Sequence, residues 1–223
     1  MGGLRFEVIR QLTARRAQKV ASVALLCVAL SGCALLGAGK KAANTYDLLA
    51  PAQISAGQRT GLQIIVNTPS AVRSLESDRI LVKPAASQLA YFPAAVWSDR
   101  LPRLVQARLV EAMQNSGRFR AVGDGRDKID GDIQVLGNIR AFQIDVVEKF
   151  ATAHIEIFIK LVDDKSQRTV SSKKFSAFSD ASDNNTEAGI AALNKAFQKL
   201  VPQIVKWVGQ VRVTAKVESS EDG

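Results

Sequence analysis

The clearest pattern in the chain is an alternation of apolar and polar side chains in its second half. From Ala151 to Leu161 every second residue is apolar, and Phe158 alone breaks the polar face between them. Ile133 to Ala141 alternates similarly, before a break at Asp145 to Lys149. A period of two places successive side chains on opposite faces of a strand. We therefore predict long, half-buried antiparallel strands, with a polar strand over Arg168 to Phe178 at or near an edge.

A helical period replaces this alternation in the middle of the chain. Between Ser98 and Gly117, apolar residues recur every three or four positions, and Ser98 or Asp99 is placed to cap a helix. Pro102 falls in the first turn, where its missing N–H costs little. We predict a helix that ends at Gly117, followed by a short strand over Arg118 to Gly123.

A second, longer helix is predicted from about Asn184 to Gln210. Its apolar residues are spaced for one face, and Asn184 followed by Glu187 resembles a capping arrangement. Pro202 interrupts this pattern, and a proline inside a helix costs roughly 3 kcal/mol through its lost hydrogen bond and ring clash. We therefore expect a kink near Lys199 or a division into two helices.

Shorter strand signals occupy the first half of the domain. Thr45 to Leu49 and Leu62 to Val66 are short apolar runs that end just before prolines. Arg79 to Lys83 and Gln88 to Phe92 flank a break at Pro84 and are expected to pair as a hairpin. Together with the two helices, these strands predict an α/β (α+β) fold: a single domain with a mainly antiparallel or mixed β-sheet packed by two main helices.

The N-terminus has the pattern of a lipoprotein signal peptide. Five Lys or Arg residues and one Glu precede Val20 to Leu30, an eleven-residue apolar run. This run is shorter than the roughly 20 residues needed to cross a bilayer. It closes on Leu30-Ser31-Gly32-Cys33, which resembles the bacterial lipobox, where the cysteine sulfur receives diacylglycerol before cleavage and the freed amine is then acylated. The alternative is that Cys33 is an ordinary small residue just past a simple cleavage site.

Cleavage at the lipobox would divide the chain into four segments. These are a signal peptide over 1–32, a lipidated cysteine and flexible tether over 33–44, the domain over 45–212, and a disordered tail over 213–223. Fully extended, the tether reaches no more than about 35 to 40 Å. Two or three acyl chains hold a protein stably on a membrane. Because Ala34 stands where Asp would resemble an inner-membrane retention signal, we expect a periplasmic protein anchored in the inner leaflet of the outer membrane.

Charge and cysteine content exclude some classes of partner and linkage. The net charge is +9, but five of the 30 basic residues and one of the 21 acidic residues leave with the signal peptide, so the mature chain carries +5. The remaining basic residues are scattered among acids, whereas a nucleic-acid binder needs a dense basic stripe. We therefore expect no nucleic-acid partner. Cys27 leaves with the signal peptide and Cys33 is acylated, so no disulfide is expected.

Candidate chemistry is sparse. His154 is the one histidine, placed in the middle of a predicted strand, and is expected to be satisfied or solvent-facing because a metal site needs further ligands. The acid-rich segment 124–132 lacks the glycine position of a calcium loop, and Gly37 to Lys41 lacks the first glycine and the Ser or Thr of a phosphate loop. No G-x-S-x-G elbow occurs. We expect no metal, no cofactor and no enzymatic activity, and favour a binding or scaffolding role.

The order of several short motifs resembles one protein family. The motifs are Tyr46-Asp47-Leu48-Leu49, Asp78 to Val82, Leu89 to Phe92, Trp97 to Leu101, Leu109 to Met113, Ser116 to Phe119, Ile129 to Ile133, Ala153 to Glu156, and a closing helix with Trp207. Together, after a lipobox, they resemble the ABC-type transport auxiliary lipoproteins of the PqiC kind over nearly the whole mature chain. The interior Pro202 is a departure that leaves the course of the last helix open.

The resemblance implies a periplasmic lipoprotein that accompanies an MCE-domain protein, a permease and an ATPase in lipid transport between the two membranes of a Gram-negative envelope. Such a protein would help to hand phospholipid or another apolar substrate across the periplasm, and self-association into a homo-oligomer is open. One alternative is a structural outer-membrane lipoprotein that maintains envelope integrity without transport. Another is a periplasmic enzyme whose polar residues do not form a recognisable pattern.

The resemblance transfers one defined site, the lipidation site Cys33. From the residues themselves, Tyr91, Trp97 and Leu101 form a candidate partner interface at the entry to the first helix, since Trp and Tyr often anchor interfaces. The alternative is that these side chains fill the core where the helix begins.

Overall fold

The fold is built around one long strand, β7 (Ile133–Val147), in the computed structural model of the chain. The structure describes residues 42–54, 57–126, 130–148 and 150–211. Along one edge, β7 pairs antiparallel with β8 (Phe150–Asp163), which pairs antiparallel with β9 (Thr169–Asp180). Among the described strands β9 pairs with β8 alone, so it is an edge strand. The predicted antiparallel strands and the predicted polar edge strand are confirmed.

The other edge of β7 receives three short strands one after another, all parallel to it. They are β2 (Gln63–Val66), β3 (Ser70–Ala71) and β4 (Arg79–Ala85). A 3-10 turn, η2 (Arg73–Leu75), lies between β3 and β4. The sheet continues outward from these strands through β6 (Ala121–Asp124) beside β2, β5 (Gln88–Trp97) beside β4, and β1 (Asn44–Tyr46) beside β5. The described residues thus form a mixed sheet of nine strands, which confirms the predicted mixed sheet.

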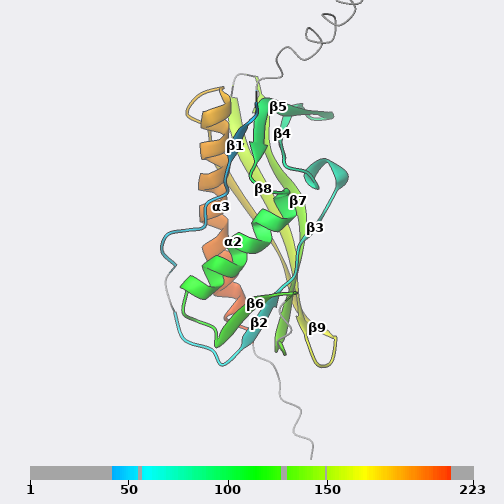
Figure 1. Ribbon diagram of the computed structural model, residues 1–223, viewed down its shortest axis with the longest axis vertical. Coiled ribbons are helices and arrows are strands. Elements are labelled where there is room, and N and C mark those ends of the chain that lie inside the picture. The colour runs from blue at the N-terminus through cyan, green and yellow to red at the C-terminus, as the bar shows by residue number, and fades with distance from the viewer. Residues whose placement is uncertain (1–41, 55–56, 127–129, 149, 212–223) are drawn as a thin grey trace, which may run out of the picture. The chain divides into compact units, whose positions relative to one another are not determined.

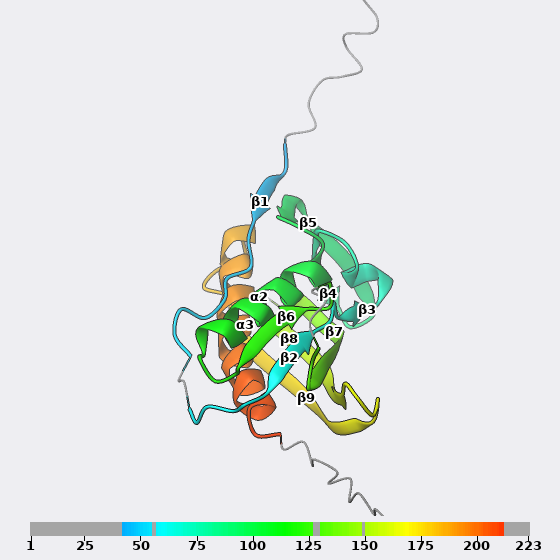
Figure 2. The same cartoon turned by 60° about the horizontal axis from the view of Figure 1, so that its bottom comes forward.

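Two helices cover one face of this sheet. Helix α2 (Leu101–Asn115) packs on β2 and β6, α3 (Thr186–Val208) packs on β8 and β9, and the helices touch each other. Figures 1 and 2 show both on the same side of the strands, with α2 lying obliquely to α3. All described elements belong to one compact unit that begins at Ala43, which confirms the predicted single domain with two main helices. Neither helix in the described part of the chain combines the length and hydropathy that a bilayer-spanning helix needs.

The core lies between the helices and the inner face of the long strands. Its fully buried members include Ile155, Ile157, Ile159 and Leu161 from β8, Val105 and Met113 from α2, and Leu193, Phe197, Leu200 and Ile204 from α3. Burying such a side chain contributes about 1.5 to 3 kcal/mol. The period-two pattern of β8 and the three-to-four period of the helices therefore bury their apolar faces against one another.

The start of α2 differs from the prediction. Arg100 occupies the N-cap position without a side-chain hydrogen bond, so neither Ser98 nor Asp99 caps the helix. Strand β5 runs on to Trp97, which leaves these two residues in the connecting turn. There the Asp99 carboxylate accepts a hydrogen bond from the Arg100 amide at 2.7 Å. The predicted cap is therefore wrong, because the Asp99 side chain bonds within the connecting turn and the Ser98 hydroxyl bonds to Asp47.

The start of α3 lies one residue later than predicted. Asn185 is the N-cap, and its side-chain oxygen accepts a hydrogen bond from the Ala188 amide at 2.8 Å. This geometry satisfies one of the first helical N–H groups, which have no partner within the helix. The capping residue is therefore Asn185 and not the neighbouring Asn184.

Helix α3 passes through Pro202 without dividing, so the predicted division into two helices is wrong, while the alternative of a kink near Lys199 stays a prediction. Leu200, Val201, Ile204 and Val205 are fully buried on both sides of the proline. Their combined burial exceeds the roughly 3 kcal/mol that the proline costs. Tertiary packing thus overrides the local helix-breaking signal.

Several strand boundaries also differ from the prediction. Strand β7 continues through the predicted break, because Asp145 pairs with Lys83 on β4 and with Thr152 on β8. Pro84 lies inside β4, so the β4–β5 hairpin, which is confirmed, turns later than expected. The signal peptide predicted over 1–32, Cys33 and the tail predicted over 213–223 lie outside the described residues.

Replacing Pro202 by Ala tests whether the proline still carries a local cost in α3. We expect Pro202→Ala to raise the free energy of unfolding by about 1 to 3 kcal/mol, because alanine restores an amide donor to a helix whose position is set by burial. Chemical denaturation measures the change, with Lys206→Ala at an exposed position of the same helix expected to stay within about 0.5 kcal/mol. A destabilised Pro202→Ala protein would show that α3 needs the proline ring for packing.

Candidate functional site at the N-terminal strap

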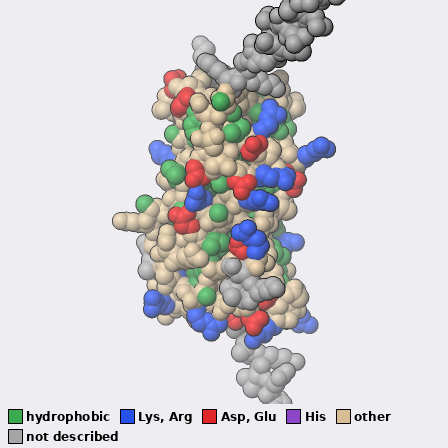
Figure 3. All heavy atoms as spheres, viewed as in Figure 1, with side chains coloured by type: hydrophobic (Ala, Val, Ile, Leu, Met, Phe, Trp, Pro, Cys, Tyr) green, Lys and Arg blue, Asp and Glu red, His purple; other side chains and the backbone are tan. Residues whose placement is uncertain are grey.

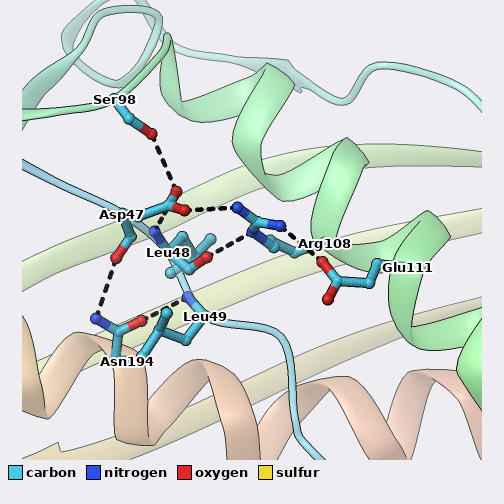
Figure 4. A network of polar contacts seen from close by, with 7 residues as sticks. All are labelled: Asp47, Leu48, Leu49, Ser98, Arg108, Glu111 and Asn194. Atoms are coloured by element: carbon cyan, nitrogen blue, oxygen red, sulfur yellow. Dashed lines mark hydrogen bonds and ion pairs between the residues drawn. The ribbon is translucent and has the colours of Figure 1, made fainter.

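The segment that follows β1 lies across the helical layer as an extended strap, defined here as Asp47–Leu49. Figure 4 shows the strap between α2 and α3, with side chains from both helices directed toward it. The side chain of Leu48 is fully buried, whereas that of Leu49 is 52% exposed. Strand β1 and the strap are the first parts of the folded unit after the predicted tether. Any force that acts on the tether would therefore reach the fold first at β1 and the strap.

Arg108 of α2 holds the strap from one side. Its Nε donates a hydrogen bond to the Leu48 carbonyl oxygen at 2.6 Å, and its Nη2 lies 2.6 Å from Asp47 Oδ2. Its Nη1 donates to Glu111 Oε2, also at 2.6 Å. Partial burial opposes the charge of Arg108, but the hydrogen bond to Glu111 and the negative charge of Asp47 outweigh it and raise the pKa. The guanidinium therefore stays charged and uses its planar fork to join side chain and backbone.

Asn194 of α3 holds the strap from the other side. Its Oδ1 accepts a hydrogen bond from the Leu49 amide at 2.8 Å, and its Nδ2 donates to the Asp47 carbonyl oxygen at 3.4 Å. One carboxamide thus serves a donor and an acceptor of the strap backbone, as a neighbouring strand would. Just before the strap, the Tyr46 hydroxyl donates to Glu187 Oε1 at 3.3 Å, which adds a second contact to α3.

Asp47 connects these contacts to the sheet. Its Oδ1 accepts hydrogen bonds from the Leu48 amide at 2.9 Å and from the Ser98 hydroxyl at 3.0 Å, while Oδ2 faces Arg108. Ser98 lies in the turn between β5 and α2. The strap is therefore fixed to both helices and to the end of β5. The network places one guanidinium, that of Arg108, between the carboxylates of Asp47 and Glu111 and contains no activated nucleophile, so its role is to connect the strap to the rest of the fold.

The predicted partner-interface residues do not share one environment. Trp97 and Leu101 are 2% and 1% exposed, and Trp97 packs edge-on against Phe142 with ring centroids 6.1 Å apart. For these two residues the core alternative holds, because neither side chain reaches the surface. Tyr91 is partly buried under the guanidinium of Arg79, 3.7 Å from its ring centroid. A contact role for Tyr91 stays a prediction.

The other candidate side chains have structural partners. His154 Nδ1 lies 3.2 Å from Asp145 Oδ2, and its ring stacks on Phe178 with centroids 4.4 Å apart, which confirms a satisfied strand histidine. In the acidic segment, Asp132 Oδ2 accepts from the Gln63 amide at 2.8 Å, and Asp124 binds Arg126. Within the described ranges, no three His, Cys, Asp or Glu side chains gather as a metal site would require.

Sequence reasoning missed the residues that hold the strap, although one signal could have found them. Arg108 lies four positions from both Leu104 and Ala112, so it falls on the apolar stripe of α2. Asn194 likewise lies four positions after Ile190 on the apolar stripe of α3. A polar side chain at such a position must find a partner inside the fold. The pattern marks these residues as structural, but it does not say what they bind.

Replacing Arg108 by Met tests the contribution of the strap contacts. Methionine keeps an apolar stem but removes all three charged hydrogen bonds, and bonds to charged groups contribute about 1.5 to 3 kcal/mol. We expect Arg108→Met to lower the free energy of unfolding by about that amount and to speed hydrogen exchange at the Leu49 amide. Arg103→Met, at an exposed arginine of the same helix, is the control. Equal effects of the two substitutions would mean that the strap network contributes nothing specific.

Comparison with known proteins identifies a family for most of the folded unit. Residues 46–205 match the family described as ABC-type transport auxiliary lipoprotein component. An uncharacterised protein of Bradyrhizobium diazoefficiens is 27% identical over 164 residues, which make up 73% of this chain and 44% of that protein. The chain thus spans less than half the length of this relative.

Solved structures share the architecture. A crystal structure of a protein from Xanthomonas campestris is 27% identical, with a TM-score of 0.70 over 74% of this chain and 94% of that chain. A crystal structure of an uncharacterised protein is 11% identical, with a TM-score of 0.58 over 75% and 99% of the two chains. The second likeness concerns the fold alone.

The family match begins at Tyr46, the last residue of β1, and ends at Val205 in α3. It therefore includes the strap, the sheet and both helices. The family is a transport auxiliary lipoprotein family and not an enzyme family. The chain belongs to the family of ABC-type transport auxiliary lipoprotein components.

Proposed function

We propose that the protein is the lipid-anchored accessory subunit of an MCE-type ABC transport system. In this role it aids the movement of phospholipid or another apolar substrate between the inner and outer membranes. The observation that carries the proposal is the family match over residues 46–205, which follows directly on a lipobox-like Cys33 and a short tether. The site of action is the periplasm, with the acyl chains in the inner leaflet of the outer membrane.

The interior and the hollows of the domain favour an adapter over a lipid carrier. The space between the helices and the sheet is filled by buried side chains. A hollow beside α2 is lined by charged and polar residues that include Asp99, Arg103, Glu111 and Arg126. An acyl chain would need a mainly apolar cavity. Such a lining is better suited to contact with another protein than to storage of lipid.

The distribution of charge on the surface also favours an adapter role. Figure 3 shows Lys and Arg side chains interspersed with Asp and Glu on the face that carries α2. Mixed charge of this kind supports specific protein contacts, whereas a single basic field would favour nucleic acid. The partners in this proposal are the MCE-domain protein and, through it, the permease and ATPase.

The strap gives the anchored adapter a defined attachment point. Asp47 and Arg108 tie the start of the domain to α2, and Asn194 ties it to α3. A domain held in this way keeps a constant position at the end of its tether. It can therefore present the same surface to a transport complex that spans the periplasm.

Acylation at Cys33 is tested by labelling. We expect cells grown with labelled palmitate to incorporate the label into the wild-type protein and into Cys27→Ala, because Cys27 lies within the signal peptide. Cys33→Ala should lose the label entirely, since it removes the sulfur that receives diacylglycerol. Incorporation into Cys33→Ala at the wild-type level would show that the anchor is elsewhere.

Association with a transport complex is tested by recovery from native envelopes. We expect the acylated protein, solubilised in mild detergent and captured by a C-terminal tag, to bring down an MCE-domain protein together with a permease and an ATPase. A deletion strain should show altered phospholipid distribution between the membranes. Repeated recovery without an MCE-domain protein, with normal lipid distribution and bound cell wall, would instead support a structural outer-membrane lipoprotein.

A further inference from the structure

Two hairpin tips lie at one end of the sheet. Strands β4 and β7 run parallel, with Lys83 opposite Asp145, so the turn that follows Ala85 lies level with the turn that follows Val147. The upper part of Figure 1 shows β4, β5, β7 and β8 reaching this end. We call it the hairpin end, defined as residues 84–89, 147, 148 and 150.

The chain enters the fold from the same end. Strand β1 runs parallel to β5, with Asn44 opposite Ala95 and Tyr46 opposite Trp97. Strand β5 begins at the hairpin end with Gln88. The N-terminal end of β1 therefore points toward the hairpin end, and the strap contacts fix that direction.

The hairpin end exposes apolar side chains that the fold does not use. Phe150 is 74% exposed and Val147 is 67% exposed, the two highest values among large apolar residues in the described part of the chain. They face each other across the β7–β8 hairpin, and Leu89 of the neighbouring hairpin is 52% exposed. Of the other exposed apolar side chains, Val72 lies between β3 and η2 and Val170 lies near the start of β9, both away from this end.

We propose that the hairpin end contacts the bilayer that holds the acyl chains of Cys33, with Val147 and Phe150 in the interfacial layer. The inference rests on the lipid anchor of the proposed function. Residues 34–43 can span at most about 35 Å, so a domain entered from this end stays within reach of its own membrane. Two side chains are too few to hold a protein on a membrane alone, but the anchor keeps them at high local concentration near the lipid.

Charge at the hairpin end indicates that the contact is apolar. Asp145 is paired with His154, Glu148 is exposed at the turn, and Lys83 is partly buried beside them. Among the described residues of this end, these groups do not form a basic patch that would bind anionic head groups. The contact should therefore persist in high salt, which screens interactions between exposed charges.

The cysteine content of the mature chain allows a direct test. Cys33 is its one natural cysteine and its sulfur is acylated in this proposal, so an introduced cysteine is the single free thiol. Val147→Cys and Phe150→Cys place a thiol at the hairpin end. Val170→Cys, at an exposed position near the start of β9, places one at the opposite end of the sheet, where Thr169 pairs with Val162.

Each acylated full-length mature variant is labelled with an environment-sensitive fluorophore and placed in vesicles of phosphatidylethanolamine and phosphatidylglycerol. We expect the labels at positions 147 and 150 to shift to shorter emission wavelength and to be quenched several-fold more by nitroxide lipids than the label at 170. High salt should leave this difference unchanged.

Three outcomes would overturn the inference. Labels at 147 and 150 that are as accessible to water as the label at 170, on protein with acylated Cys33, would show that the hairpin end faces away from the lipid, while the transport proposal would stand. Shielding that appears only after an MCE-domain protein is added would make this end a protein contact. Absence of acyl chains on Cys33 would remove the anchor from both proposals.

Discussion

The burial of the inner face of β8 against α3 is the contact on which the rest of the structure depends. One side of β8 is fully buried, and α3 supplies the opposing apolar surface. The buried residues are Ile155, Ile157, Ile159 and Leu161. Because side chains alternate along a strand, a shift in register by one residue would expose this whole set. The register of β8 therefore also fixes β7, to which it is paired along its length, and β7 places the three parallel strands on its other edge.

The strap depends on this framework and connects it to the predicted anchor. Arg108 and Asn194 reach Asp47–Leu49 only because α2 and α3 lie together on one face of the sheet. Their hydrogen bonds satisfy backbone groups of a segment that belongs to no strand, which would otherwise be costly to bury. The result is a domain whose entry point is held by both helices. This arrangement suits a transport auxiliary lipoprotein, because an auxiliary component must present its contact surface in a constant position.

Much of the fold could be predicted because burial imposes a period on each element. The alternation from Ala151 to Leu161 and the stripes of both helices reflect the core directly. The parallel pairing of β2, β3 and β4 with β7 could not be predicted, since a short apolar run shows burial but neither direction nor neighbour. The division of α3 at Pro202 does not occur, because packing on both sides of the proline offsets its local cost, which the sequence pattern alone does not show. The strap partners of Arg108, Asp47 and Leu48, lie about 60 residues away in sequence, beyond the reach of any local pattern.

The central proposal is that acyl chains on Cys33 confine a transport auxiliary domain to an envelope membrane, where it acts by contact. The most direct test is the intact mass of the native mature protein extracted from the envelope. The account predicts a chain that begins at Cys33 and carries a diacylglyceryl group on sulfur and a fatty acyl group on the amine. A mature chain with a free Cys33 thiol, or one that retains residues 1–32, would contradict it.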